Sequence, residues 1–138
     1  MTTAAFQPLS AVQVATAMHK GVITCSRHAP LSDVARLMTD RNVHCVVVVD
    51  DEDPRYPWAL ISDLDLTAAA SVRQLDGQTA GGTAATPVVM VSPDESVERA
   101  AQLMTEHGVA HLVVADRHTL RPVGVISTLD IAREAVAA

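Results

Sequence analysis

Aromatic residues and cysteines are scarce in this sequence of 138 residues, and their scarcity limits how it can fold. Only Phe6, Tyr56 and Trp58 are aromatic, although 49% of the residues are hydrophobic, so the core must be built from Val, Ala, Leu, Ile and Met. The two cysteines, Cys25 and Cys45, are too few for a disulfide framework. Both lie in apolar stretches, where a cysteine usually serves as a small core residue.

Positive charge and long apolar runs are also lacking. The formal net charge is −6, which argues against broad binding to the phosphate backbone of nucleic acids. No apolar run approaches the roughly 20 residues needed to cross a bilayer, and the start has no basic segment followed by an apolar one. We therefore expect a cytoplasmic protein with neither a nucleic-acid nor a membrane partner.

The sequence does contain an internal repeat. Residues Val22–Asp50 align without a gap on Val88–Asp116, with an offset of 66 and ten identities in 29 positions. The similarity resumes between Ala59–Leu66 and Gly124–Ile131 with an offset of 65, so the intervening loop is one residue shorter in the second half. We call the two halves copy one and copy two. Such a repeat predicts related surfaces that face each other and form paired clefts.

Both copies show the same order of expected elements: strand, helix, strand, strand, helix. Cys45–Val49 is a continuous apolar run, typical of a strand that is covered on both faces, as in parallel sheets. In copy one the other strands are expected at Val22–Cys25 and Trp58–Ile61, and the second helix runs from Leu64 to Val72. Pro30 suits the entrance of the first helix. That helix has apolar residues at positions i, i+3, i+4 and i+7, namely Leu31, Val34, Ala35 and Met38.

Copy two repeats this pattern. Its strands are expected at Val88–Val91, His111–Ala115 and Val123–Ile126, and its last helix at Leu129–Val136. The apolar stripe of its first helix consists of Val97, Ala100, Ala101 and Met104.

The repeats define the expected domain organisation. Residues 1–9 form a loose N-terminal segment, 10–75 the first repeat, 76–82 a glycine-rich linker and 83–138 the second repeat. Ser10–Met18 is expected to be a short helix that leads into copy one, and Thr79–Thr86 is its weaker counterpart. Neither half buries enough apolar surface to be stable alone. We therefore expect an α/β (α+β) fold whose two β-α-β-β-α repeats pack as a pseudo-twofold pair.

The strongest local signal lies where the third strand of each copy meets its second helix. Copy one has Ser62 followed three residues later by Asp65, and copy two has Ser127 followed by Asp130. In one interpretation each pair is a capping box, in which the serine accepts from an orphan amide and the acid complements the helix dipole. In the other, the serine and the helix N-terminus donate to a phosphate, while the carboxylate accepts from the hydroxyls of a ribose.

The repeated element order, the Val-Val-x-Asp ends of the second strands and the hydrophobic-hydrophobic-Ser-x-x-Asp junctions together resemble the cystathionine-β-synthase (CBS) domain. Over about residues 10–137 the chain is similar to a stand-alone tandem CBS pair. The resemblance implies that Ser62 with Asp65, and Ser127 with Asp130, bind the phosphate and ribose of adenosine ligands. It also implies that residues just before and within the first strand of each copy line the base. By alignment these base-lining residues are Ile23, placed near Ser127 and Asp130, and Val89, placed near Ser62 and Asp65.

Copy two matches the family pattern better. Many members have glycine before the hydrophobic residues of the third strand, where this chain has Gly124 in copy two but Ala59 in copy one. Three cations are candidates for contact with a phosphate, although a role as a solvated surface residue is favoured for each: Lys20, Arg27 and Arg133. Because they form no dense cluster, we favour a mono- or diphosphate nucleotide or S-adenosylmethionine over tight ATP binding.

The sequence contains six histidines, but their spacing does not indicate a metal site. Zinc needs three or four converging ligands, and the sequence has neither paired CxxC nor HxxxH spacing. We predict no metal site, no catalytic residues and no obligatory cofactor.

Together these features predict a non-catalytic regulatory module that binds AMP, ADP, ATP or S-adenosylmethionine in clefts between two CBS repeats. Ligand binding would change the surface offered to an effector protein. The resemblance also implies a homodimer, formed through the helical stripes described above, unless those stripes are intramolecular core. The alternative is a ligand-independent interaction module in which the Ser-x-x-Asp junctions are only helix caps.

Overall fold

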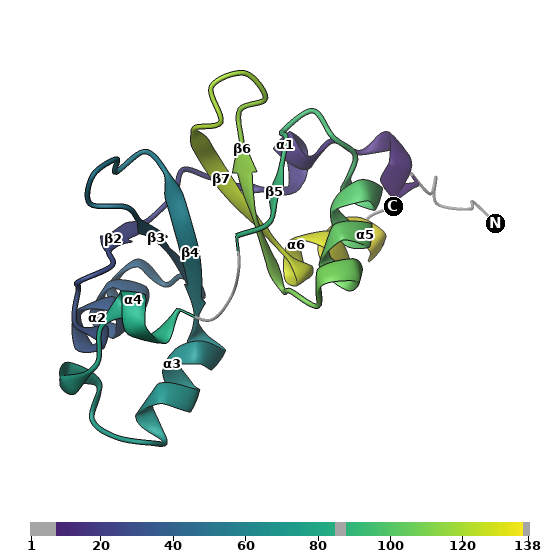
Figure 1. Cartoon of the computed structure of the whole chain (residues 1–138). Helices are drawn as coiled ribbons and strands as arrows, with labels where there is room; N and C mark the ends of the chain where they lie inside the picture. Colours follow the sequence, from purple (N-terminus) through teal and green to yellow (C-terminus); the bar gives the residue numbers. More distant parts are fainter. Residues whose placement is uncertain (1–7, 85–87, 137–138) are drawn as a thin grey trace. The chain divides into compact units, whose positions relative to one another are not determined.

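The segment that leads into copy one does not fold with copy one. The computed structural model describes residues 8–84 and 88–136 (Figure 1), and these form two compact units. The copy-one unit contains the described residues between Val22 and Val88. The copy-two unit contains those up to Gly21 together with those from Val89 onward. The helix expected at Ser10–Met18 therefore belongs structurally to the unit built around copy two.

The copy-one unit contains a three-stranded sheet in the order β2-β3-β4. Its strands are β2 (Thr24–Ser26), β3 (Cys45–Val49) and β4 (Pro57–Ser62). β3 is parallel to β2 and antiparallel to β4. All four valines of β3 are at most 7% exposed, which confirms that this apolar run is a strand covered on both faces. Its pairing is parallel on one edge only.

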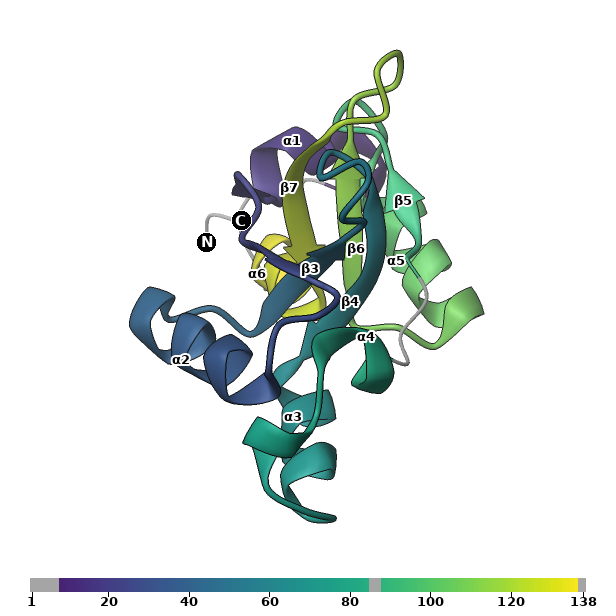
Figure 2. The same ribbon diagram turned by 60° about the vertical axis from the view of Figure 1, so that its left-hand side comes forward.

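Two longer helices and two short ones complete this unit: α2 (Leu31–Arg41), α3 (Asp63–Ala70), the 3-10 helix η2 (Leu75–Gly77) and α4 (Ala80–Thr83). Alternate residues of β3 and β4 share one core with the apolar faces of α2 and α3, so both helices lie against the same face of the sheet (Figure 2). α2 ends at Asn42, whose φ of +52° stops the helix in the left-handed conformation.

The glycine-rich segment 76–82, expected as a linker, is folded onto the copy-one unit. It contains the end of η2 and most of α4, and the Gly81 amide donates to the Arg27 carbonyl oxygen at 2.6 Å. A Cβ at position 81 would lie 2.8 Å from that oxygen. Gly81 therefore permits a close backbone approach between this segment and Arg27.

The copy-two unit contains a four-stranded sheet in the order β1-β7-β6-β5. β5 is parallel to β6, and the other two pairings are antiparallel. The strands are β1 (His19–Lys20), β5 (Met90–Val91), β6 (His111–Ala115) and β7 (Pro122–Ser127). The helices are η1 (Leu9–Ala11), α1 (Val14–Ala17), α5 (Val97–His107) and α6 (Thr128–Val136).

The lead-in segment is integrated into this unit by backbone hydrogen bonds and by burial. The Val14 amide donates to the Glu95 carbonyl oxygen and the Val97 amide to the Val12 carbonyl oxygen, each at 2.8 Å. Val12 and Val14 join the same core as α5, β6 and β7. The expected helix is present but short, and the strand β1 that follows it was not predicted.

The apolar stripes of α2 and α5 are core residues. Val34 and Met38 belong to the core of the copy-one unit, and Ala100 and Met104 to that of the copy-two unit, all at most 5% exposed. These four residues are therefore not available as a dimer surface. Ala35 and Ala101 of the same stripes are only half-buried, and the homodimer stays a prediction.

Candidate functional site

The junction in copy one is a complete capping box. Ser62 is the N-cap of α3, and its Oγ accepts from the Asp65 amide at 3.2 Å. In return, the Asp65 carboxylate accepts from the Ser62 amide at 2.9 Å. The two backbone donors at the start of the helix are thus satisfied reciprocally.

The junction in copy two has the same geometry. Ser127 Oγ accepts from the Asp130 amide at 3.2 Å, and Asp130 Oδ2 accepts from the Ser127 amide at 2.8 Å. The capping interpretation is therefore correct for both copies. The cap still leaves atoms available for a ligand, because it uses neither the hydroxyl hydrogen of the serine nor the second oxygen of the carboxylate.

Asp130 is the one charged side chain among the described residues that is buried, at 3% exposure. Its Oδ1 lies 3.1 Å from Nε2 of His19 on β1 and 3.4 Å from a guanidinium nitrogen of Arg133, one helical turn further along α6. Asp65, its counterpart in copy one, is only half-buried. The two predicted ribose acceptors therefore have different surroundings.

The first helical residues also distinguish the junctions. The Asp63 amide donates to the His44 carbonyl oxygen, and the equivalent Thr128 amide donates to the Ala110 carbonyl oxygen. In copy one the Asp63 carboxylate then accepts from the Leu64 amide at 2.9 Å and lies 2.9 Å from Nδ1 of His44. Copy one therefore places a carboxylate at the helix N-terminus, where copy two has the neutral threonine.

The two predicted base-lining residues occupy matching positions in different units. The Ile23 carbonyl oxygen accepts from the Val47 amide at 2.9 Å, and the Val89 carbonyl oxygen accepts from the Val113 amide at 3.0 Å. Both side chains are half-buried and contact the core of their own unit. The structure places Ile23 in the copy-one unit and Val89 in the copy-two unit, and their pairing with the opposite junctions stays a prediction.

The three candidate cations have separate roles. Arg133 contacts Asp130, and Lys20 is exposed on β1. The Arg27 guanidinium lies over the ring of Trp58, 5.5 Å from its centroid. Of the three, only Arg133 has a described contact with a residue of either Ser-x-x-Asp junction.

The cysteines are partly buried and free of disulfides. Burial raises the pKa of Cys25 to about 11. For Cys45, burial together with the negative charges of Asp65 and Asp63 raises the pKa to about 12. Cys45 therefore lies close enough to the copy-one junction to sense its charge.

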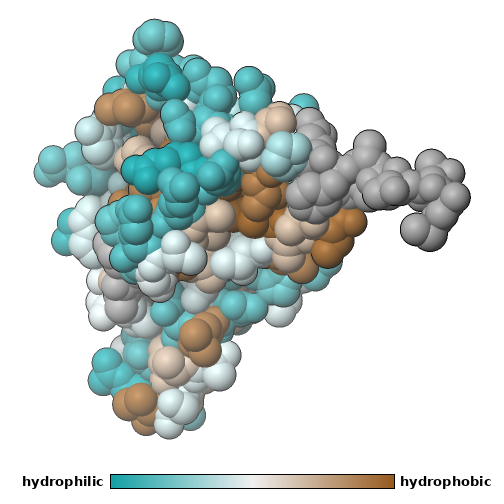
Figure 3. Space-filling model, turned by 90° about the vertical axis from the view of Figure 1, so that its right-hand side faces the viewer, coloured by the Kyte–Doolittle hydropathy of each residue, from teal (hydrophilic) through white to brown (hydrophobic). Residues whose placement is uncertain are grey.

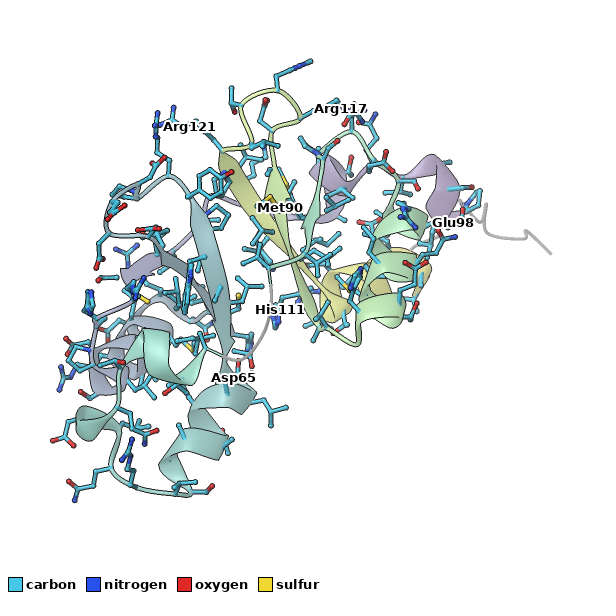
Figure 4. All side chains as sticks on the ribbon, in the orientation of Figure 1. Asp65, Met90, Glu98, His111, Arg117 and Arg121 are labelled. Carbon is cyan, nitrogen blue, oxygen red and sulfur yellow. The ribbon has the colours of Figure 1, made fainter. Side chains whose placement is uncertain are left out.

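A cavity of about 300 Å³ lies at the other end of the copy-two sheet, and its lining includes Met90, Ala115 and Arg117. Figure 4 labels Met90, which lies in β5, and Arg117, which follows β6. Ser127 pairs with His111 at the start of β6, whereas Ala115 is at its end. The cavity is therefore separate from the Ser127–Asp130 junction. Within residues 8–84 and 88–136, no group of three His, Cys, Asp or Glu side chains could hold a metal ion.

Sequence reasoning missed His19 as a neighbour of Asp130. His19 lies outside both repeats' motifs and more than 100 residues from Asp130 in sequence, so no local pattern links the two. The only available signal was Gly124, whose missing side chain leaves room for β1 on β7.

Comparison with known proteins identifies the family. The sequence profile of the CBS domain matches residues 12–71 and 83–137. A CBS domain-containing protein of Bacillus subtilis, YhcV, is 30% identical over 112 residues, which cover 80% of this chain and 76% of that protein. The chain therefore belongs to the CBS domain family, with two copies of the domain.

Solved structures share the fold. CBS domain protein PAE2072 from Pyrobaculum aerophilum, complexed with AMP, is 25% identical with a TM-score of 0.77, and the match covers 92% of this chain and all of that one. The CBS domain pair of protein MJ0100, complexed with 5-methylthioadenosine and S-adenosyl-L-methionine, is 21% identical with a TM-score of 0.76. That match covers 88% of this chain and 98% of the other. Among the described helices of the present chain, none has the length and hydrophobicity to cross a membrane.

Proposed function

We propose that this chain is a non-catalytic regulatory module that binds an adenosine-containing ligand at its Ser-x-x-Asp junctions. The observation that carries the proposal is the geometry shared by Ser62–Asp65 and Ser127–Asp130. In each, a serine hydroxyl and a carboxylate are fixed by a reciprocal cap at the start of a helix. The AMP bound by the related PAE2072 gives independent support for this class of ligand.

The chemistry of the junction suits a nucleoside. A carboxylate oxygen accepts from the vicinal hydroxyls of a ribose, as acidic residues do in other nucleotide sites. The serine, whose oxygen is already held by an amide, can donate its hydrogen to a phosphate oxygen at the positive end of the helix. Half-buried Ile23 and Val89 offer apolar contact to the base. No bond of the ligand needs to be made or broken for this binding.

The two junctions differ as phosphate sites. In copy one the Asp63 carboxylate already accepts from an amide of the first turn of α3, and its charge repels a second anion. Copy two has Thr128 at this position and Arg133 one turn beyond Asp130. Copy two is therefore the junction suited to a phosphate, while copy one suits the uncharged adenosine part of a ligand or the cationic sulfonium of S-adenosylmethionine.

The output of the module requires partners. A ligand that binds one arrangement of the two units more tightly shifts the population toward it and changes the surface offered to an effector protein.

Leu64 and Leu129, at equivalent positions in α3 and α6, are 73% and 53% exposed. On the face shown in Figure 3, hydrophobic side chains form separate patches among hydrophilic ones. We assign a second copy of the chain to these helices. Light scattering of Leu64→Glu/Leu129→Glu should then report a monomer where the wild type is a dimer.

The alternative remains a ligand-independent interaction module in which both junctions act only as caps. A thermal-shift panel of AMP, ADP, ATP, NAD and S-adenosylmethionine separates the two functions. A ligand that binds the native state stabilises it by RT ln(1 + [L]/Kd), or about 2.7 kcal/mol at a hundredfold excess over Kd. We expect at least one of these compounds to raise the melting temperature. No shift with any of them at millimolar concentration would favour the alternative.

A further inference from the structure

The imidazole of His19 contacts the oxygen of the Asp130 carboxylate that would accept from a ribose at the copy-two junction. Asp130 Oδ2 is held by the cap, so Oδ1 is the oxygen left for a ligand. His19 Nε2 lies 3.1 Å from this Oδ1, and Arg133 lies 3.4 Å from it on the same helix. The Asp130 side chain is only 2% exposed, whereas the side chain of His19 is 70% exposed.

The backbone fixes His19 in this place, but its side chain can leave. β1 pairs with β7 in the register His19 to Val125 and Lys20 to Gly124, and the Gly21 amide donates to the Val123 carbonyl oxygen at 2.8 Å. These bonds hold the main chain of the segment on the edge of the sheet. Because most of the imidazole faces solvent, rotation about its own side-chain bonds can carry it away from Asp130 Oδ1.

We propose that His19 is a built-in competitor at the copy-two junction and determines its affinity for the ribose. This proposal rests on the proposed function above. A ribose hydroxyl that donates to Asp130 replaces the imidazole as the partner of the same oxygen. Part of the gain from the new hydrogen bond is therefore offset by the loss of the 3.1 Å contact with His19.

The competitor also has a selective effect. A nucleoside that offers two adjacent hydroxyls can replace the imidazole, whereas one that lacks them leaves Asp130 to His19. Arg133 stays beside the carboxylate whether or not the imidazole is displaced, because Arg133 and Asp130 lie one turn apart on the same helix. His19 thus lowers the affinity for an intact ribose and leaves that for a dideoxy analogue unchanged, so it reduces the preference of the junction for the ribose.

The test uses adenosine, which avoids the charge of a phosphate, and isothermal titration calorimetry on the full chain in an Asp65→Asn background, where copy one is weakened. His19→Ala removes one largely exposed contact to the Asp130 carboxylate, worth about 1 kcal/mol. This change should tighten adenosine binding roughly fivefold. Lys20→Ala changes the next residue of the same strand and should leave adenosine binding unchanged. 2′,3′-Dideoxyadenosine, which has neither hydroxyl, should bind the wild-type and His19→Ala forms equally.

Several results would overturn the proposal. Equal adenosine affinity in the His19→Ala and parent forms, weaker binding after the change, or an equal gain for dideoxyadenosine would each show that His19 does not compete at Asp130. If adenosine binds the wild type but neither the Asp65→Asn form nor its His19→Ala derivative, copy two does not bind a ribose, and the competitor is excluded while the proposed function stands. If adenosine binds no form of the chain, and the nucleotide panel also gives no shift, both proposals fail.

Discussion

Gly124 of β7 lies so close to the backbone of His19 that no side chain fits between them. A Cβ on Gly124 would overlap the His19 carbonyl oxygen and approach the Met18 sulfur to 2.9 Å. The glycine that the family pattern places before the hydrophobic residues of the third strand thus has a packing role in copy two. It lets the lead-in segment lie along β7 and brings His19 to Asp130.

Gly124→Ala should separate β1 from β7. The obstacle is a backbone oxygen, which cannot move aside without breaking the pairing, so we expect a loss of about 1–3 kcal/mol in the free energy of unfolding, measured by urea denaturation. Gly77→Ala is the matched control, because a Cβ there meets nothing within 4 Å. Equal stability of the two variants would show that β1 is not held by this contact.

Asp51 and Arg117 stand at equivalent positions in the two repeats and carry opposite charges. Asp51 accepts from Ser26 Oγ at 2.6 Å and lies 2.8 Å from His28 Nε2. At the equivalent place in copy two, Arg117 donates to Asp94 at 3.0 Å and to Ser92 at 3.3 Å. Hydrogen bonds from Ser92 and Arg117 lower the pKa of Asp94. The same loop contact therefore occurs in both copies, with the acid at position 51 in copy one and at position 94 in copy two.

This reversal predicts that copy one tolerates the polarity of copy two. Asp51→Arg alone places the new guanidinium beside His28, without the acidic partner that Arg117 has in Asp94, and should lower the urea midpoint, while His28→Asp/Asp51→Arg should restore it. Because the pair is exposed to solvent, the change should be only about 0.3–1 kcal/mol and should shrink in high salt. A double variant no more stable than Asp51→Arg would contradict the equivalence of the two contacts.

The thiol of Cys45 should report the charge of the copy-one junction. With pKa values of about 11 and 12 for Cys25 and Cys45, alkylation by iodoacetamide at pH 8 should be slower than for a free cysteine by roughly a hundredfold or more. Asp65→Asn removes one of the charges that raise the pKa of Cys45, so it should speed alkylation there. Cys25, whose pKa is raised by burial alone, is the internal control. Equal acceleration of both thiols would indicate general loosening of the unit instead.

The difference between the junctions can be tested by exchanging one residue. Thr128→Asp brings the carboxylate of copy one into copy two and should weaken AMP binding about three- to tenfold, with little effect on adenosine, because the added charge repels only the phosphate. Thr128→Asn, similar in size but neutral, is the control for each ligand in calorimetry. Equal weakening of AMP and adenosine by Thr128→Asp would place the phosphate away from this residue.

Much of the fold could be predicted because each copy carries strong local patterns. The run Cys45–Val49 and its counterpart His111–Ala115 have the predicted bounds. Both contain at least four consecutive apolar residues bounded by an acidic residue at position 50 or 116, which is a clear strand pattern. Pro30 marks the start of α2 as expected. The Ser-x-x-Asp pairs could be located because the cap and the ligand site require the same residues.

What could not be predicted depends on contacts between distant segments. The assignment of the lead-in segment to the copy-two unit arises from bonds such as Val14 to Glu95, more than 80 residues apart. The folding of Gly81 onto Arg27 is a long-range contact of the same kind, which composition described only as a linker. The contact between His19 and Asp130 also follows from this docking, so local sequence patterns could not reveal the burial of the predicted ribose acceptor.

The most direct test of the central claim is a calorimetric titration of AMP into the wild type and into Asp65→Asn/Asp130→Asn. Asparagine keeps an oxygen that can accept from the serine amide, so both caps persist, but it has lost the carboxylate charge and one of the two acceptor oxygens. The account predicts saturable AMP binding to the wild type and at least a tenfold loss of affinity in the double variant, with urea denaturation showing that both are folded. AMP binding of unchanged affinity in the folded double variant would contradict the claim that these two aspartates hold the ligand.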